Sequence, residues 1–204
     1  MPIHKKTSVG ITGLMGSGKS EVANYLKRTG YPVLLMDLIG HECLNEYDVV
    51  DKLTSAFGQE IIDRSQTIDR KKLGKIVFSN QKKLTLLNSI LHPIMNEKAK
   101  KWIIRHYENG EDLVFVEAAV LFEMKMELFL DYTILVQAPE KEIIKRIILR
   151  DGKTIEEIKR ILNKQSVDAR KADYVIYNKG TLEELHQSCQ ALLSWINNQI
   201  IDLQ

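Results

Sequence analysis

Residues 9–20 read Val9-Gly10-Ile11-Thr12-Gly13-Leu14-Met15-Gly16-Ser17-Gly18-Lys19-Ser20. From Gly13 to Ser20 this stretch fits the pattern G-x-x-x-x-G-K-S, which is typical of a loop that binds phosphate. In such a loop, glycines let backbone N–H groups turn inward around the phosphate oxygens. The lysine reaches the β- and γ-phosphates, and the serine hydroxyl binds Mg²⁺. The stretch therefore predicts a nucleoside triphosphate site formed by Gly13, Gly16, Ser17, Gly18, Lys19 and Ser20.

The residues on either side of the loop support this interpretation. Val9 to Ile11 form an apolar run, as expected of a strand, and Val22, Ala23 and Leu26 lie at helical spacing before Gly30. A helix that begins at Lys19 would also direct the positive end of its dipole at the phosphates. The alternative, a glycine-rich turn that binds nothing, does not require this order of strand, loop and helix.

The composition argues against several classes of protein. The chain has 204 residues, of which 44% are hydrophobic, and this is enough for one substantial α/β core. Its 29 basic and 27 acidic residues are well mixed, so no basic face predicts nucleic-acid binding. No apolar run approaches the roughly 18 residues of a membrane span, and we expect no membrane partner.

The two cysteines indicate a reducing compartment. Cys43 and Cys189 fit neither the C-x-x-C pattern nor a metal-ligand spacing, so both are expected to be packed thiols. The N-terminus carries no apolar signal core before the phosphate-loop pattern. We therefore expect a cytoplasmic protein, either a monomer or a small homo-oligomer.

Apolar runs elsewhere in the chain predict four further strands with helices between them. This alternation predicts an α/β fold, a phosphate-loop NTPase with a parallel five-stranded sheet flanked by helices. The sheet core of this single domain is expected to comprise residues 1–37, 111–140 and 165–204. The expected strands are residues 8–12, 32–36, 113–116, 131–136 and 172–178.

Residues 38–110 contain no strand pattern and predict a series of helices. Asp48, Asp69 and Ser79 are each expected to cap one of them, and His92-Pro93 is expected to start another. An all-helical insertion of this length favours a region that binds the substrate. Extra packing without a ligand is the simpler alternative.

Residues 141–164 predict a small helical lid. Gly152 separates two helices, and a capping box at Thr154 and Glu157 starts the second one. Arg146 and Arg150 lie four residues apart on one side of the first helix, where they could stabilise the charge of a γ-phosphate during transfer. The alternative is an ordinary solvated basic face.

Acidic residues follow two of the predicted strands. Glu117 ends an apolar strand, an arrangement that holds Mg²⁺ or its waters in phosphate-loop proteins. Asp37 ends the strand at 32–36, at the edge where open α/β sheets bind ligands. Asp37 fits two roles equally well, the N-cap of a following helix at 38–45 or a base for an acceptor hydroxyl. Glu123 could cap a helix, bind a ligand or be exposed.

Arg70 and His92 are candidate ligands within the helical region. An arginine in the first turn of a helix is normally solvated, and a single histidine before a proline more often has a structural role. The residue types alone therefore favour structural roles for both.

Several stretches, taken in order, resemble the dephospho-coenzyme A kinase family over nearly the whole chain. Each is a weak indication alone, and together they are specific. The stretches are Gly10–Gly13 with Gly16–Ser20, Asp37 with His41, Asp69–Leu73 with Ile76–Phe78, Leu87-Asn88 with Leu91–Pro93, Leu121–Glu123, Arg146 with Arg150-Asp151, Gln165, and Ala172–Ile176 with Asn178 and Gly180.

The resemblance implies ATP-dependent phosphorylation of the 3′-hydroxyl of the ribose of dephospho-coenzyme A, the last step of coenzyme A synthesis. It implies a nucleoside-monophosphate-kinase-like core with a helical substrate region and a lid. It also implies roles for individual residues: Asp37, Lys19 and Arg146 in catalysis, Gly13, Gly16 to Glu21 and Arg150 in ATP binding, Ser20 and Glu117 in Mg²⁺ binding, and Asp37, Arg70, His92 and Glu123 near the acceptor.

The chain departs from the family pattern at three positions. The family has two acids, Asp-x-Asp, at the end of the second strand, whereas here Leu35 replaces the first one and leaves Asp37 alone. One carboxylate can both orient and deprotonate a hydroxyl, so we expect Asp37 to suffice. Ala119 replaces a usual proline, and Glu21 replaces a usual threonine.

Three other functions are compatible with parts of the sequence. The first is another small-molecule or nucleoside kinase of the same fold. The second is a GTP-binding switch, because Asp37 to Gly40 fits D-x-x-G and Asn178 to Thr181 is one residue from N-K-x-D. Thr181 lacks the carboxylate that would read guanine, which argues against it. The third is a binding protein without catalysis, supported only by Leu35.

Overall fold

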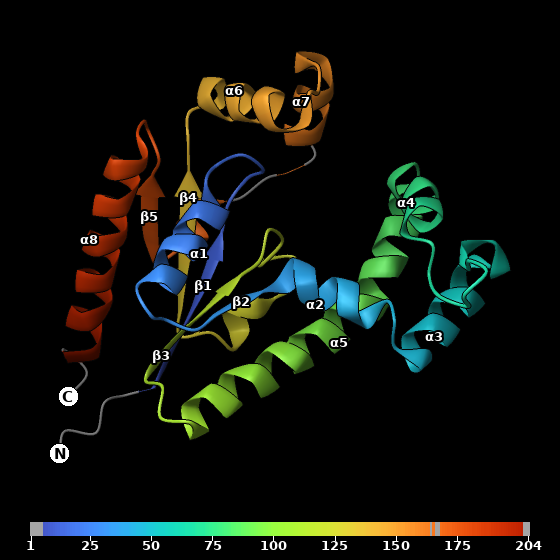
Figure 1. The fold of residues 1–204 in the computed structure, drawn as a ribbon, viewed down its shortest axis with the longest axis horizontal. Helices are drawn as coiled ribbons and strands as arrows, with labels where there is room; N and C mark the ends of the chain where they lie inside the picture. Colours follow the sequence, from blue (N-terminus) through green and yellow to red (C-terminus); the bar gives the residue numbers. More distant parts are fainter. Residues whose placement is uncertain (1–5, 164, 166–167, 202–204) are drawn as a thin grey trace. The chain divides into compact units, whose positions relative to one another are not determined.

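The computed structural model describes residues 6–163, 165 and 168–201, and its five strands form one sheet (Figure 1). The strand order is β2-β3-β1-β4-β5, and β1 pairs in parallel with both β3 and β4, as does β4 with β5. The predicted five-stranded parallel sheet is confirmed. The strands are β1 (Thr7–Thr12), β2 (Val33–Leu35), β3 (Leu113–Glu117), β4 (Tyr132–Gln137) and β5 (Tyr174–Tyr177).

Helices connect the strands, and α1 and α8 pack against each other on the sheet (Figure 1). Three short 3₁₀ turns lie at 59–61, 126–128 and 169–171. No helix among the described residues is long and apolar enough to cross a membrane. The α-helices are α1 (Lys19–Arg28), α2 (Met36–Cys43), α3 (Tyr47–Phe57), α4 (Arg70–Phe78), α5 (Gln81–Glu108), α6 (Glu140–Asp151), α7 (Ile155–Leu162) and α8 (Leu182–Ile201).

The chain forms two compact units, each described here by itself. Unit 1 consists of Met1–Leu34 and Trp102–Gln204 and contains most of the sheet, whereas unit 2 is Leu35–Lys101 and is helical. Unit 2 overlaps the helical region expected at 38–110. Its last helix, α5, continues beyond Lys101, because the apolar side of that helix continues as well.

The second strand is shorter than the sequence indicated. The apolar run suggested a strand up to Met36, but β2 ends at Leu35 and Met36 is the first residue of α2. Met36 is 1% exposed, so an apolar residue is required there in either conformation. Asp37 therefore lies in the first turn of a helix and neither ends a strand nor caps α2, where Leu35 holds the N-cap position. A carboxylate in this turn is stabilised by the helix dipole.

Helix α5 is continuous through Pro93, which corrects the expectation that His92-Pro93 starts a new helix. Proline in a helix removes one backbone hydrogen bond and normally bends or ends the helix. Here Leu91, Met95 and Ala99 remain buried on both sides of the proline. Burial of this apolar stripe offsets the local preference of proline, since packing supplies most of the stability of helices in proteins.

Three N-cap predictions have different outcomes. Asp69 caps α4 as expected, because its side chain accepts hydrogen bonds from the backbone N–H groups of Lys71 and Lys72. Asp48 lies inside the first turn of α3, which follows Glu46. Ser79 ends α4, where its hydroxyl donates to the carbonyls of Lys75 and Ile76.

The residue that caps α5 is Asn80, one position after the serine that the sequence suggested. Its side-chain oxygen accepts from the N–H groups of Lys82 at 3.0 Å and Lys83 at 3.2 Å. Serine and asparagine are both preferred caps, so residue type could not separate the neighbouring candidates. The predicted capping box at Thr154 with Glu157 is confirmed, and Thr181 with Glu184 forms a second one at the start of α8.

Replacing Asn80 by alanine should destabilise the protein by about 1 kcal/mol, because two N–H groups at the start of α5 lose their acceptor. Ser79→Ala, the matched neighbour, should change the free energy of unfolding by less than about 0.5 kcal/mol. Urea unfolding followed by circular dichroism measures both. A larger loss of unfolding free energy in Ser79→Ala than in Asn80→Ala would contradict the assignment of Asn80 as the cap of α5.

Candidate active site

The phosphate-binding pattern forms the connection between β1 and α1 in unit 1. Gly13, Gly16 and Gly18 have φ angles of 153°, 78° and 107°, a range that residues with a side chain rarely adopt. Gly18 holds the N-cap position of α1, so the helix begins at Lys19 as the sequence predicts. The Ser20 side chain is exposed in the first helical turn. These are the local features of a phosphate-binding loop, in which the N-terminus of a helix lies beside the phosphates.

Lys19 and Glu117 lie together, as expected of residues that serve one site. The Lys19 Nζ atom is 3.9 Å from Glu117 Oε1, and the two side chains are 11% and 8% exposed. Sheet register explains this: Glu117, the last residue of β3, pairs with Ile11 near the end of β1. Burial strengthens the attraction between the two charges compared with a surface pair.

Arg146 forms hydrogen bonds with the phosphate loop in this structure. Its guanidinium donates to the carbonyl oxygens of Gly16 and Ser17, both at 3.3 Å, and to Asn178 Oδ1 at 3.1 Å. Arg146 is half-buried and is not part of a solvated basic face. Arg150, one turn later, is exposed and pairs with Asp151 at 2.7 Å. Hydrogen bonds from its guanidinium lower the pKa of that carboxyl.

Asn178 contacts the same part of the loop, a role that the sequence did not predict. Its Nδ2 donates to the Ser17 carbonyl at 2.8 Å, and the residue is 5% exposed. A Cβ atom on Gly18 would lie 2.2 Å from this Nδ2, so a glycine is needed for the approach. The sequence placed Asn178 at the end of the expected strand at 172–178 and among the stretches that resemble the family, but neither indicated this contact.

Gln165 is a second residue whose contact the sequence did not predict. Its Oε1 accepts a hydrogen bond from the Met15 N–H at 3.1 Å, within the phosphate loop. Glu21, expected beside the phosphates, pairs with Arg28 at 3.0 Å and lines a small pocket together with Gly18 and Arg146. Glu123 is exposed on a turn after β3.

Unit 2 contains a cleft of about 870 Å³, and two of the predicted acceptor residues, Asp37 and Arg70, line it. His41 lines it as well, and its side chain hydrogen-bonds to Arg70. His92 is half-buried on α5 and does not line this cleft, although its neighbour Leu91 does. The apolar lining comes mainly from α4 and α5, through Leu73, Val77, Phe78, Leu87, Leu91 and Met95.

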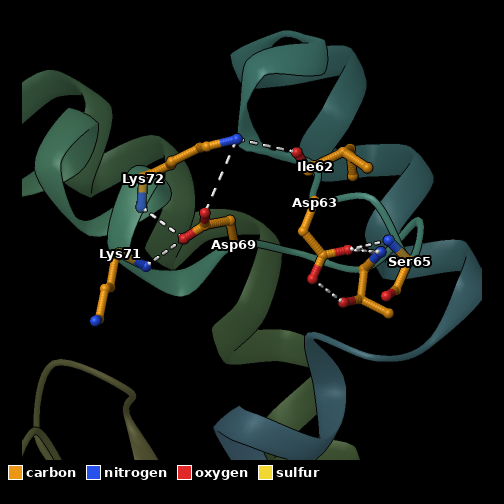
Figure 2. Close-up of polar contacts among 7 residues, drawn as sticks. Ile62, Asp63, Ser65, Asp69, Lys71 and Lys72 are labelled. Carbon is orange, nitrogen blue, oxygen red and sulfur yellow. Dashed lines mark hydrogen bonds and ion pairs between the residues drawn. The ribbon is translucent and has the colours of Figure 1, made fainter.

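A hydrogen-bonded loop before α4 determines where Arg70 begins the helix (Figure 2). Asp63 accepts from the N–H and the hydroxyl of Thr67 and from the N–H of Ser65, and these bonds lower the pKa of Asp63. Asp69 then caps the helix, and Lys72 Nζ donates to the Ile62 carbonyl at 3.3 Å. All of these hydrogen bonds join residues between Ile62 and Lys72, so local contacts hold the start of α4.

The comparison with known families agrees with this arrangement. The family model described as dephospho-CoA kinase matches residues 7–184. This chain belongs to the dephospho-CoA kinase family. The match extends over both units, and it includes the phosphate loop, Glu117, Asp37, Arg70, Arg146 and Asn178.

Individual relatives confirm membership of the dephospho-CoA kinase family. A dephospho-CoA kinase of Arabidopsis thaliana is 35% identical over 189 residues, which cover 91% of this chain and 82% of that protein. A dephospho-CoA kinase structure from Campylobacter jejuni is 26% identical, with a TM-score of 0.62 and coverage of 94% and 97%. The crystal structure of TT1252 from Thermus thermophilus is 32% identical, with a TM-score of 0.76 and coverage of 93% and 97%.

Replacing Asn178 by leucine should weaken ATP binding by this family member about tenfold or more. The change keeps the approximate shape but removes the donor to Ser17 and the acceptor for Arg146, and each buried unpaired group costs about 1–3 kcal/mol. Part of that cost enters the binding free energy, because phosphate must then order a looser loop, and about 1.4 kcal/mol is a factor of ten.

Calorimetric titration with ATP measures this effect. Asn109→Leu, at an exposed asparagine after α5, is the matched control and should bind ATP as the wild type does. An unchanged dissociation constant in Asn178→Leu would show that the loop does not depend on this contact.

Proposed function

We propose that this protein transfers the γ-phosphoryl group of ATP to the 3′-hydroxyl of the ribose of dephospho-coenzyme A, which yields ADP and coenzyme A. The observation that carries the proposal is the phosphate loop with Lys19 beside Glu117, in a chain that matches the dephospho-CoA kinase family over residues 7–184. In this reaction the acceptor oxygen forms a bond to the γ-phosphorus, and the bond from that phosphorus to the ADP oxygen breaks.

Unit 1 supplies the groups that hold ATP. The loop from Gly13 to Gly18 and the N-terminus of α1 bind the phosphates, and Lys19 stabilises the charge that spreads over the γ-phosphoryl oxygens during transfer. Arg146 adds positive charge directly beside the loop, since its guanidinium lies on the carbonyls of Gly16 and Ser17. Arg150 would have to leave Asp151 before it could contact ATP.

Ser20 and Glu117 suit Mg²⁺ as the metal partner of ATP. A hydroxyl and a carboxylate are hard oxygen donors, the type that Mg²⁺ prefers, and this ion usually takes its other ligands from waters and substrate phosphates. The described residues contain no cluster of three or more His, Cys, Asp or Glu side chains for a metal, so the protein alone offers few ligands. When bound, Mg²⁺ would neutralise part of the phosphate charge.

Unit 2 supplies the acceptor groups. Asp37 is exposed in the cleft, where its carboxylate can take the proton of the attacking hydroxyl, and Arg70 lies in the same cleft. The cleft is lined by charged side chains and also by a long run of apolar ones. This combination suits an acceptor with a diphosphate and a long chain better than a small alcohol. His92 and Glu123 remain proposed acceptor ligands on the family pattern alone.

We further propose that the reaction takes place in the cytoplasm. Cys43 and Cys189 are free and buried, as suits a reducing compartment. Burial raises the pKa of Cys189 to about 12, so its thiol stays protonated and unreactive near neutral pH.

The direct test of the proposed reaction is ADP release from ATP with a panel of acceptors. Dephospho-coenzyme A should support turnover, whereas adenosine, shikimate and gluconate should not, and phosphorus NMR of the product should show a new 3′-phosphate monoester. Turnover with a small alcohol at a higher kcat/KM would favour the alternative kinase. GTP in place of ATP tests the switch alternative, which predicts slow hydrolysis without any acceptor.

Lys19→Ala should lower kcat by about 10² or more, because it removes a charge that acts on the transition state and contributes little packing. The thermal midpoint should hardly change. Lys27→Ala, at an exposed lysine of the same helix, should leave kcat unchanged. A Lys19→Ala variant with near-normal turnover would show that the phosphate loop is misassigned.

Asp37→Asn should lower kcat by about 10² to 10⁴, the usual contribution of a general base, and should leave the ATP dissociation constant unchanged. Asp48→Asn is a matched control, because Asp48 also lies in the first turn of a helix but does not line the cleft. Its kcat should equal that of the wild type. Equal kcat values in Asp37→Asn and wild type would leave Asp37 without a catalytic role.

A further inference from the structure

Two residues of the unit 2 cleft share a hydrogen bond that the reaction scheme above does not use. Arg70 is the first residue of α4, and His41 lies in α2, 29 positions earlier. The Arg70 Nη2 group contacts His41 Nε2, and both side chains line the cleft. Both are also exposed, so a ligand in the cleft could reach them.

The chemistry of this contact determines which ring nitrogen of His41 carries the hydrogen. A guanidinium has five N–H donors and no acceptor, so the histidine nitrogen that faces it must accept. The contact therefore requires an imidazole that carries its hydrogen on Nδ1 and accepts through Nε2. A protonated imidazole has no free lone pair and would repel the guanidinium.

Among the residues that the structure describes, Arg70 has no acidic partner, unlike three other arginines of this chain. Arg28, Arg150 and Arg170 pair with Glu21, Asp151 and Asp168. Within the part of the chain that the structure describes, no carboxylate lies within ion-pair distance of Arg70. A neutral imidazole therefore orients the guanidinium and leaves its positive charge uncompensated.

The start of α4 is held by contacts that do not involve the Arg70 side chain, and Figure 2 shows the cap at Asp69. Asp69 accepts from Lys71 and Lys72 N–H groups at 3.0 Å, and its own N–H donates to the Ile61 carbonyl at 2.7 Å. These contacts fix where α4 starts but leave the long Arg70 side chain free to rotate. Among the described residues, the hydrogen bond to His41 is the polar contact of that side chain.

We infer that His41 is a positioning residue that holds the Arg70 guanidinium ready for the diphosphate of the acceptor, and that it does so only while its imidazole is neutral. This inference rests on the proposed function, which supplies an acceptor with a diphosphate. The planar fork of a guanidinium matches phosphate oxygens, and Lys71 adds a second positive charge to the cleft lining. Orienting the side chain beforehand reduces the entropy lost on binding.

Acceptor binding should therefore weaken as the pH falls. The other charged groups that line this cleft are Asp37 from α2, Asp63 and Asp69 from the loop, and Lys71 from α4, whereas α5 contributes only Leu87, Leu91 and Met95. Among these side-chain types, histidine is the one that ordinarily changes charge between pH 5 and 8. The acceptor diphosphate is a diester and stays ionised throughout this range.

The test is calorimetric titration of the full protein with dephospho-coenzyme A in the absence of ATP, from pH 5.5 to 8. His41→Phe should bind on the order of tenfold more weakly at pH 8 and lose the pH dependence, because it cannot accept from Arg70. His41→Gln should recover most of the affinity at all pH values, since an amide oxygen accepts regardless of pH. In turnover assays, His41→Phe should raise the KM for the acceptor, with little change in kcat or in the KM for ATP.

Two arginine variants complete the experiment. Arg70→Ala should weaken binding, and adding His41→Phe to it should have no further effect, because the histidine acts through the arginine. Arg64→Ala, at an exposed arginine of the preceding loop that does not line the cleft, is the matched control.

The inference is wrong if His41→Phe keeps the wild-type affinity and pH profile, or if His41→Gln binds as weakly as His41→Phe. Failure of the proposed function is a separate result, because the wild type would then neither bind nor phosphorylate dephospho-coenzyme A. A wild type that phosphorylates this acceptor while the His41 variants behave alike leaves the function intact and rejects only the inference.

Discussion

A loop that directs its N–H groups inward around phosphate leaves carbonyl oxygens on its outer side, and these need partners of their own. In unit 1 the partners are Asn178 and Arg146, which donate to the carbonyls of Ser17 and Gly16. Asn178 follows β5 and Arg146 belongs to α6, so segments that are distant in sequence donate hydrogen bonds to the same short stretch of backbone. The glycines of the loop provide the unusual φ angles and the space for Asn178.

The basic residues that we propose bind phosphate differ between the two units in whether an acidic side chain compensates their charge. Lys19 faces Glu117 at 3.9 Å with both side chains largely buried, so neither charge is isolated from its counterion. Arg70 is held by a neutral acceptor and keeps its full charge for an anion. A buried ammonium without a partner would be costly, whereas an exposed guanidinium is still solvated. Burial thus explains why the two basic residues have different kinds of partner.

The single acid at the end of the second strand has a structural context that the family pattern alone did not indicate. Leu35 holds the N-cap position and Asp37 lies in the first turn of α2, so the two residues are not neighbours on one face of a strand. An acid at position 35 would occupy a cap, where it would interact mainly with backbone N–H groups of the helix. Asp37 is the residue of this pair that lines the cleft.

The sequence alone determined the features that depend on a few consecutive residues. These are the phosphate loop and the start of α1, the cap at Asp69, the capping boxes of α7 and α8, and the presence of five strands in a parallel sheet, because each follows from local hydrogen bonds or from the spacing of apolar residues. Tertiary structure decided the rest: the helical start at Met36, the uninterrupted course of α5 through Pro93, the contact of Asn178 with Ser17, and the bond between His41 and Arg70. These features arise from packing and hydrogen bonds between residues far apart in the chain, where competing local preferences are similar in energy and only the assembled neighbours select one of them.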